Sequence, residues 1–136
     1  MSNVQTVKAI YEAFGKGDVP FILSCLDENV DWEKWDDNYA QQAGVPYMRH
    51  IKGRDGVVNF FGEVAKLGVK GFEVLAIMEG ENKIAVHFTI STENFDEDEI
   101  HLWTFNDEGK ITGFRHYLDT AKHIAVAEKV RSSAAS

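Results

Sequence analysis

Two histidines, His101 and His116, stand on either side of a polar turn near the end of the chain. The runs around this turn, EIHLWTF and KITGFRHYLDT, are rich in aromatic and β-branched residues, and the turn at residues 106–109 ends in a glycine. This pattern is typical of a β-hairpin. Because imidazole titrates near neutral pH, two histidines on one hairpin face are candidates for acid/base chemistry.

The register of the hairpin decides whether the two histidines meet. A two-residue loop at residues 108–109 places His101 opposite His116 and Trp103 opposite Phe114, which gives one aromatic face with an imidazole pair. A three-residue loop at residues 107–109 with a bulge moves the register by one residue and separates the histidines. The sequence is compatible with both loops.

A pocket beside these histidines would be walled by aromatic and apolar side chains. The residues expected to contact a ligand are Trp32, Phe60, His87, Trp103, Phe114 and Leu118. His87 belongs to this set only if the more polar face of its strand is the concave one. His87, His101 and His116 could also surround a metal ion, but their spacing is not that of a metal motif, so no metal or other cofactor is expected.

The hydrophobic pattern predicts the elements that position these residues. Helices are expected at residues 4–14, 19–26, 57–67 and 121–130. Strands are expected at residues 30–35, 69–78, 83–92 and on both sides of the turn. Helices followed by hairpin-connected strands predict an α+β domain over residues 1–130, with a curved antiparallel sheet packed on three helices of the N-terminal half and a short C-terminal helix. Residues 131–136 are expected to be a loose tail.

Composition narrows the classes of partner. The 136 residues suit one domain, and the net charge of −8 argues against nucleic acid and anionic membranes, which are both polyanions. No apolar run is long enough to span a membrane, no signal peptide is evident, and a single cysteine, Cys25, excludes an internal disulfide. A cytoplasmic protein is expected. Since the strand at residues 99–105 is apolar on both faces, we also expect a homodimer formed through the sheet.

Two segments, YEAFGKGD near the start and GKITGFRHYLD near the end, together with the order of elements, resemble the nuclear transport factor 2-like superfamily. Within it the chain is most similar to the SnoaL-like group, whose relatives include ketosteroid isomerases, polyketide cyclases and limonene epoxide hydrolases. The resemblance covers essentially the whole chain. It implies a cone-shaped domain whose open end holds a small apolar ligand, but it does not choose between enzymes and non-catalytic binders.

Ketosteroid isomerases offer the first residue-level comparison. They place a tyrosine seven residues before the Asp of a Gly-Asp pair, and Tyr11 stands in that relation to Asp18. They place a protonated acid four residues before a Phe-Asn turn, where this chain has His101. Their base is an Asp at the end of the first strand, a position that falls on Glu33 or Lys34, of which only Glu33 could act as a base.

The epoxide hydrolases and cyclases offer the second comparison. An acid follows the Gly-aromatic-Arg motif of these relatives, but in this chain Gly113-Phe114-Arg115 is followed by His116. The imidazole of His116 can still transfer a proton at this position. Because the carboxylate is missing, the chain is not expected to catalyse the same reactions as these relatives.

Three functions are compatible with these observations. The first is a cofactor-free isomerase, cyclase or hydrolase that binds a small apolar molecule and uses His116 as acid/base, assisted by His101 and Tyr11. The second is a non-catalytic binder of an apolar ligand in the same pocket. The third is a dimeric interaction module whose cone is filled by its own side chains.

Overall fold

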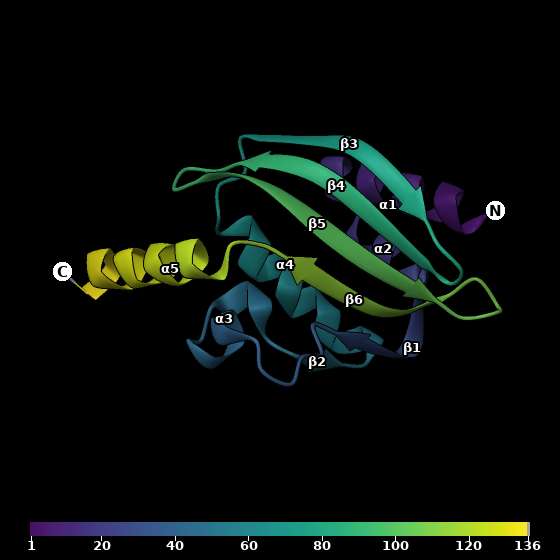
Figure 1. Cartoon of the computed structure of the whole chain (residues 1–136), viewed down its shortest axis with the longest axis horizontal. Helices are drawn as coiled ribbons and strands as arrows, with labels where there is room; N and C mark the ends of the chain where they lie inside the picture. The colour runs from purple at the N-terminus through teal and green to yellow at the C-terminus, as the bar shows by residue number, and fades with distance from the viewer. Residues whose placement is uncertain (136) are drawn as a thin grey trace.

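The computed structural model describes residues 1–135, which form an α+β domain (Figure 1). Helices and two strands occupy the first half of the chain, four strands follow, and one helix ends it. In chain order the elements are α1 (Asn3–Lys16), α2 (Val19–Ser24), β1 (Leu26–Trp32), α3 (Tyr39–Gln42), η1 (Pro46–Met48), β2 (Ile51–Lys52), η2 (Arg54–Gly56), α4 (Val57–Ala65), β3 (Gly71–Glu79), β4 (Lys83–Ser91), β5 (Asp96–Phe105), β6 (Ile111–Tyr117) and α5 (Thr120–Ala135).

The strands form one curved sheet in the order β2-β1-β6-β5-β4-β3. Helices α1, α2 and α4 lie on its concave side, as expected for a cone (Figure 1). Neighbouring strands are antiparallel except β1 and β6, which run parallel. The sheet is antiparallel as expected except at this pair, because β6 reaches β1 from far along the chain and no hairpin imposes an antiparallel direction.

The main core lies between the concave face of the sheet and these helices. Strand β4 shows the alternation that builds it, with Ile84, Val86 and Phe88 buried and the residues between them more exposed. Burying an apolar side chain of this size contributes about 1.5–3 kcal/mol. This apolar face takes the concave side, so His87 lies on the outer face instead.

Helix α1 carries Tyr11 toward the sheet. The helix begins with a capping box between Ser2 and Gln5 and ends at Gly17, whose φ of 71° is left-handed and suits glycine. Its buried residues recur at helical spacing, so one face packs on the core. Tyr11 lies beside this face and packs against the core.

The hairpin β5–β6 combines features of both expected loops. Its loop is the three-residue form, since the amide of Asn106 donates to the carbonyl of Lys110 and Gly109 has a φ of 77°. A bulge then shifts the pairing again, because Phe105 pairs with Ile111 and Thr104 pairs with Gly113. The two shifts cancel, so His101 lies opposite His116 as in the two-residue alternative.

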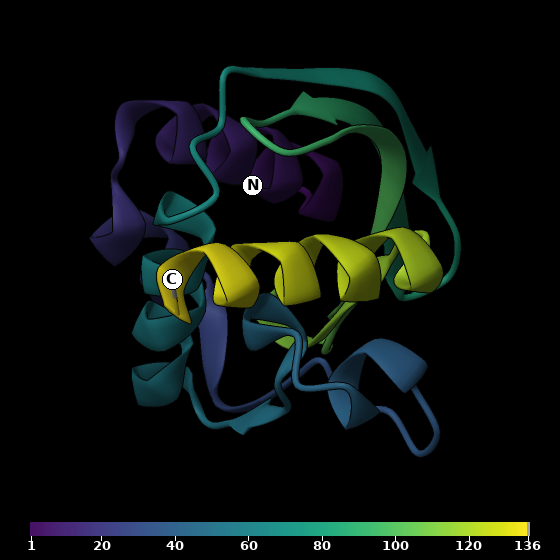
Figure 2. The same cartoon turned by 90° about the vertical axis from the view of Figure 1, so that its left-hand side faces the viewer.

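Helix α5 is longer than expected. Residues 131–135, expected as a loose tail, continue the helix, and residue 136 lies outside the described residues. The composition explains the extension, because alanine and arginine favour helix and no proline or glycine interrupts it. Figure 2 shows α5 crossing one end of the cone. There His123 is 1% exposed, and Ile124 and Val126 pack against the core.

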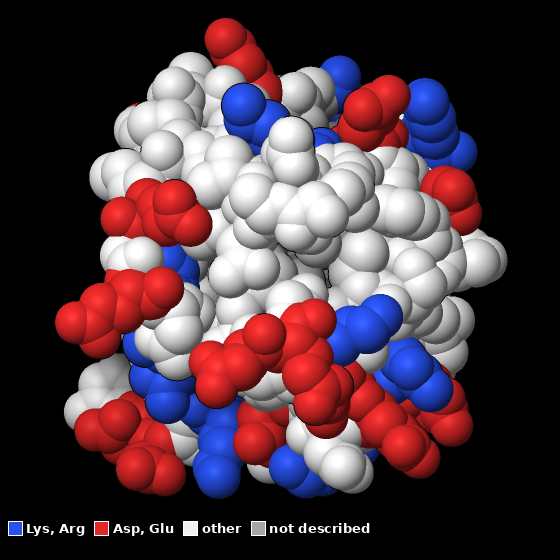
Figure 3. Space-filling model, turned by 90° about the vertical axis from the view of Figure 1, so that its right-hand side faces the viewer, with Lys and Arg blue, Asp and Glu red and all other residues white. Residues whose placement is uncertain are grey.

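The outer face of the sheet is half-buried and partly apolar. Met78, Ala85 and Leu102 lie side by side across it by strand pairing. On the side of the molecule shown in Figure 3, acidic and basic side chains are interspersed around an uncharged area. Within residues 1–135, no helix has the length and hydrophobicity needed to cross a bilayer.

Candidate functional site

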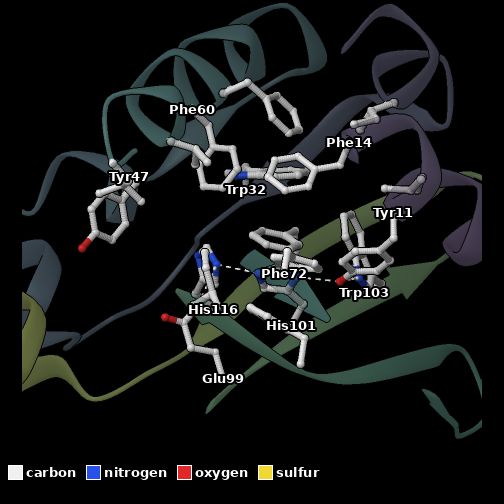
Figure 4. Close-up of a pocket in the computed structure, with 18 of the residues that line it drawn as sticks. Tyr11, Phe14, Trp32, Tyr47, Phe60, Phe72, Glu99, His101, Trp103 and His116 are labelled. Carbon is white, nitrogen blue, oxygen red and sulfur yellow. Dashed lines mark hydrogen bonds and ion pairs between the residues drawn. The ribbon is translucent and has the colours of Figure 1, made fainter. Parts of the chain in front are cut away.

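A chain of hydrogen-bonded side chains runs across β6 and β5 and ends on α1 (Figure 4). The Nε2 atoms of His101 and His116 are 2.6 Å apart. At one end, Nδ1 of His101 lies 2.6 Å from the hydroxyl of Tyr11, which accepts from Trp103 Nε1 at 3.1 Å. At the other end, Nδ1 of His116 lies 3.1 Å from Oε2 of Glu33. The chain therefore joins a buried carboxylate to a phenol through two imidazoles.

One arrangement of protons satisfies every member of this chain. The Tyr11 hydroxyl donates to His101, the Nε2–H of His101 donates to His116, and the Nδ1–H of His116 donates to the Glu33 carboxylate. If His116 gains a second proton at Nε2, it must donate to His101. His101 then donates to Tyr11, whose own hydroxyl proton becomes free to point into the cavity. Protonation of His116, beside Glu33, therefore changes the direction in which the Tyr11 hydroxyl donates its hydrogen bond.

Glu33 is held in the interior by several donors. Its side chain is fully buried and accepts from the backbone amide of His116 at 2.7 Å and from Trp35 Nε1 at 3.4 Å. The amide of Gln41 donates to its backbone carbonyl. Its φ of 59° makes it the one non-glycine residue with positive φ in the described chain. A carboxylate held in a strained backbone conformation beside a histidine is a feature found at functional sites.

The surroundings give the two histidines opposite charge preferences. Burial, together with the neighbouring His116, lowers the pKa of His101 well below its ordinary value, so this ring stays neutral. Burial also disfavours a charge on His116, but the hydrogen bond and charge of Glu33, aided by Glu99, raise its pKa above the ordinary value. Burial raises the pKa of Tyr11, which keeps the phenol protonated. Proton uptake therefore centres on His116.

A second group of buried polar residues adjoins His116. Oε1 of Glu99 lies 3.7 Å from His116 Nε2, and Oε2 of Glu99 lies 3.4 Å from Nε2 of His123 on α5. His123 also contacts Glu97 at 3.0 Å and the hydroxyl of Tyr47. Burial raises the pKa of Glu99, but the hydrogen bond from His123 and the charges of both histidines outweigh it and lower that pKa.

These polar groups meet an aromatic cavity of about 60 Å³. The void is much smaller than the roughly 300–1,000 Å³ of typical ligand pockets, so an organic ligand needs side chains to move. Several lining side chains, among them Phe14 and Phe72 (Figure 4), are only partly buried and are therefore candidates for such a movement. The lining also includes Trp32, which is fully buried and whose Nε1 has no hydrogen-bond partner among the described residues.

The structure brings most of the expected site residues together. Around the cavity lie Tyr11, Trp32, Phe60, His101, Trp103, Phe114 and His116. Two expected residues do not line this cavity: His87 and Leu118 line a surface groove that Glu99 and His116 also border. His87 is on the outer face of β4 beside Asp98, at 3.5 Å, because the more apolar face of that strand turned inward. Leu118 follows the last residue of β6, where the chain leaves the sheet.

Sequence reasoning missed the second buried group. The stretch at residues 93–99 reads as a solvated acidic turn, but Asp96 already begins β5. The alternation of side chains along β5 could have revealed this group, because Glu97 and Glu99 lie on the same face of the strand as His101. His123 carried no comparable signal, because its helix must first fold back over the cone.

Comparison with known proteins identifies the family of this fold and site. The family model described as a SnoaL-like domain matches residues 7–114. The chain belongs to the SnoaL-like family. No curated protein sequence matches it.

Solved structures share the fold of this SnoaL-like protein. An NTF2-like protein of unknown function from Burkholderia pseudomallei is 27% identical, with a TM-score of 0.71 over 93% of this chain and 98% of that chain. A protein with a cystatin-like fold from Xanthomonas campestris is 17% identical, with a TM-score of 0.75 over 93% and 98%. A steroid delta-isomerase from Pseudomonas aeruginosa is 12% identical, with a TM-score of 0.67 over 98% and 95%.

Proposed function

We propose that this SnoaL-like protein binds a small apolar molecule in its cone and moves a proton on it, with His116 as the acid/base group. The observation that carries the proposal is the buried chain from Glu33 through His116 and His101 to Tyr11, which ends in an otherwise aromatic cavity. Neighbouring buried groups whose surroundings shift their pKa values in opposite directions, as burial does for His101 and Glu33 does for His116, are typical of acid/base sites. The fold shared with a steroid delta-isomerase is compatible with such chemistry.

Glu33, His116 and Tyr11 have different roles in the proposed abstraction of a proton from the carbon next to a carbonyl group. Glu33 is fully buried and cannot reach a ligand, so it orients His116 and stabilises its protonated form. His116 takes the proton at Nε2, once a ligand has displaced the ring of His101 from that atom. Displacing the His101 ring also breaks its hydrogen bond to the Tyr11 hydroxyl, which is then free to donate to the oxygen of an enolate, where negative charge develops.

The ligand class follows from the cavity lining. The wall is aromatic, and the unpaired Trp32 Nε1–H offers one donor to a molecule that fills the void. An unpaired buried donor costs about 1–3 kcal/mol, which a ligand with an acceptor oxygen would recover. We therefore propose small cyclic ketones and enones as the class of substrate.

Replacing His116 with glutamine tests this function. Wild-type protein in chelator-containing D₂O should accelerate exchange of the protons next to the carbonyl in a panel of cyclic enones of increasing size, followed by proton NMR. His116→Gln should lower this acceleration by about 100-fold or more, because general acid/base groups contribute about 10²–10⁴-fold. His87→Gln, on the outer face, is the matched control and should retain full exchange activity.

The small cavity favours a second candidate, an interaction module whose cone is filled by its own side chains. The same panel separates the possibilities through thermal stability. Enones that stabilise the protein but do not exchange would indicate a non-catalytic binder. A protein that neither binds nor exchanges any panel member would indicate the filled cone and contradict the proposed enzyme.

We further propose that two copies associate through the outer face of the sheet. Leu102 lies at its centre, paired with Ala85 on one side and Arg115 on the other. A glutamate here would carry a charge into the dimer interface, and burying that charge is costly even beside Arg115. Leu102→Glu should weaken the dimer by about 100-fold or more, measured by analytical ultracentrifugation, whereas Thr89→Glu at the edge of the face should not. A monomeric wild-type protein would contradict the interface.

A further inference from the structure

We propose that Glu99, His101 and His116 form a binding site for one divalent transition-metal ion at the wall of the cavity. One carboxylate oxygen and two imidazole nitrogens, all from buried residues, lie within 4.8 Å of one another. The three side chains come from the neighbouring strands β5 and β6, and they face the same side of the sheet (Figure 4). No sequence motif marks them, because strand pairing and not local spacing brings them together.

The distances between the ligand atoms are close to those that a metal requires. Nitrogen and oxygen ligands lie about 2.0–2.2 Å from zinc, which places neighbouring ligands roughly 3 Å apart. The Nε2 atoms of His101 and His116 are 2.6 Å apart, and Glu99 Oε1 is 3.7 Å from His116 Nε2. Small rotations of the two rings and of the carboxylate would open the central position. At their present separation the two ring nitrogens share one proton, and a cation would take that place once they have moved apart to roughly 3 Å.

Each of the three ligands is oriented by a further buried partner. His116 directs Nδ1 at Glu33, His101 directs Nδ1 at Tyr11, and Glu99 is held by His123. A histidine that binds a metal through one nitrogen almost always donates from the other to a carboxylate or another acceptor. Both histidines meet this condition in the tautomer that leaves Nε2 free for the ion.

The charges of the site also suit a divalent cation. The side chains of Glu33 and Glu99 are 0% and 4% exposed, and both face His116. When the neighbouring imidazoles of His116 and His123 are neutral, the two buried carboxylates leave negative charge uncompensated, which is costly in the interior. A divalent ion bound by neutral His101 and His116 would balance both carboxylates.

Two imidazoles and one carboxylate are a ligand set used for zinc and for ferrous iron. The remaining coordination positions would face the aromatic cavity, where water or a ligand oxygen could bind. The ion would compete with a proton for Nε2 of His116. The inference does not rest on the proposed function, because metal binding is measured without any substrate.

A neighbouring cluster of Glu97, Glu99 and His123 is the competing location. In that cluster Lys122 already lies 3.3 Å from Oε2 of Glu97. This cation supplies the charge that a metal would bring, so the cluster with His101 and His116 is the one we assign.

The test is a titration of metal-stripped protein with Zn²⁺ by calorimetry and with Co²⁺ by visible absorption. Wild type should bind one ion per chain and give the absorption bands of Co²⁺ bound to nitrogen and oxygen. Glu99→Gln and His101→Phe should each weaken binding by more than the roughly 10–100-fold expected for loss of an orienting group, which is the loss expected for Tyr11→Phe. The phenylalanine suits the aromatic surroundings of His101.

Two controls locate the ion. His87→Gln removes a partly exposed histidine that lies 3.5 Å from Asp98 on the outer face, and it should leave the one-to-one binding unchanged. No saturable binding by the wild type would overturn the proposal. So would a site lost in His87→Gln, or a site lost in His123→Gln and retained in His101→Phe, because the ion would then lie on the surface or in the neighbouring cluster.

Discussion

Glu33→Ala should lower the free energy of unfolding by about 3–5 kcal/mol, the range for removing one partner from a buried ion pair. The carboxylate accepts from the His116 amide, the His116 ring and Trp35, and alanine leaves all of these donors without their acceptor. Urea unfolding followed by tryptophan fluorescence in chelator-containing buffer measures the loss. A loss below about 1 kcal/mol would show that water replaces the carboxylate, contrary to its full burial.

Two further variants distinguish the contribution of the Glu33 carboxylate to stability from that of its backbone conformation. Lys34→Ala, at an exposed position beside Glu33, should change the unfolding free energy by less than about 0.5 kcal/mol. Glu33→Gly loses the same carboxylate but relieves the strain of a φ of 59°, so it should be less destabilising than Glu33→Ala. Equal losses in the alanine and glycine variants would mean that the backbone conformation stores no strain.

The difference between wild type and Glu33→Ala should also depend on pH. The pKa of His116 is raised in the folded protein, with Glu33 as the main cause that opposes burial. A raised pKa stabilises the fold fully below the ordinary histidine value of about 6.5, and this contribution is lost as the pH rises through the raised value. The stability difference should therefore be largest in mildly acidic buffer and shrink in alkaline buffer.

Trp32→Ala should destabilise the protein by about 3–5 kcal/mol, the cost of truncating a large buried aromatic side chain. Trp32 is fully buried, and its ring stacks on Phe114 at 4.1 Å and meets Phe60 edge-on at 5.1 Å. Alanine would enlarge the cavity between these rings. Indole added to the variant should refill this space and raise its melting temperature by more than that of the wild type.

Trp32→Phe is the matched control. Phenylalanine keeps most of the aromatic volume and removes an Nε1–H that has no partner in the described chain. Removing an unpaired buried donor offsets part of the lost packing, so this variant should cost much less than alanine. A loss as large as that of Trp32→Ala would show that Nε1 has a partner in solution.

The sequence by itself determined the fold class and pointed to the hairpin beside which the candidate site lies. Alternation in β4 and β5, helical spacing in α1 and the similarity of two segments to relatives led to a SnoaL-like cone with His101 and His116 on one hairpin. Periodicity is sufficient here because each element buries one face, and the apolar residues mark that face. The same alternation already placed Glu97 and Glu99 on the face of β5 that carries His101. Their charge, however, favoured the prediction of a solvent-exposed turn.

Only the tertiary structure decided which polar groups meet. Glu33 reaches His116 because β1 pairs in parallel with β6 and then turns through a positive φ, which no local pattern predicts. The histidine pair depends on a bulge that cancels the shift made by the three-residue loop. His123 joins Glu99 because α5 folds back across the end of the cone. Long-range pairing and packing set these contacts, and they are what turn two histidines beside a turn into a buried chain of titratable groups.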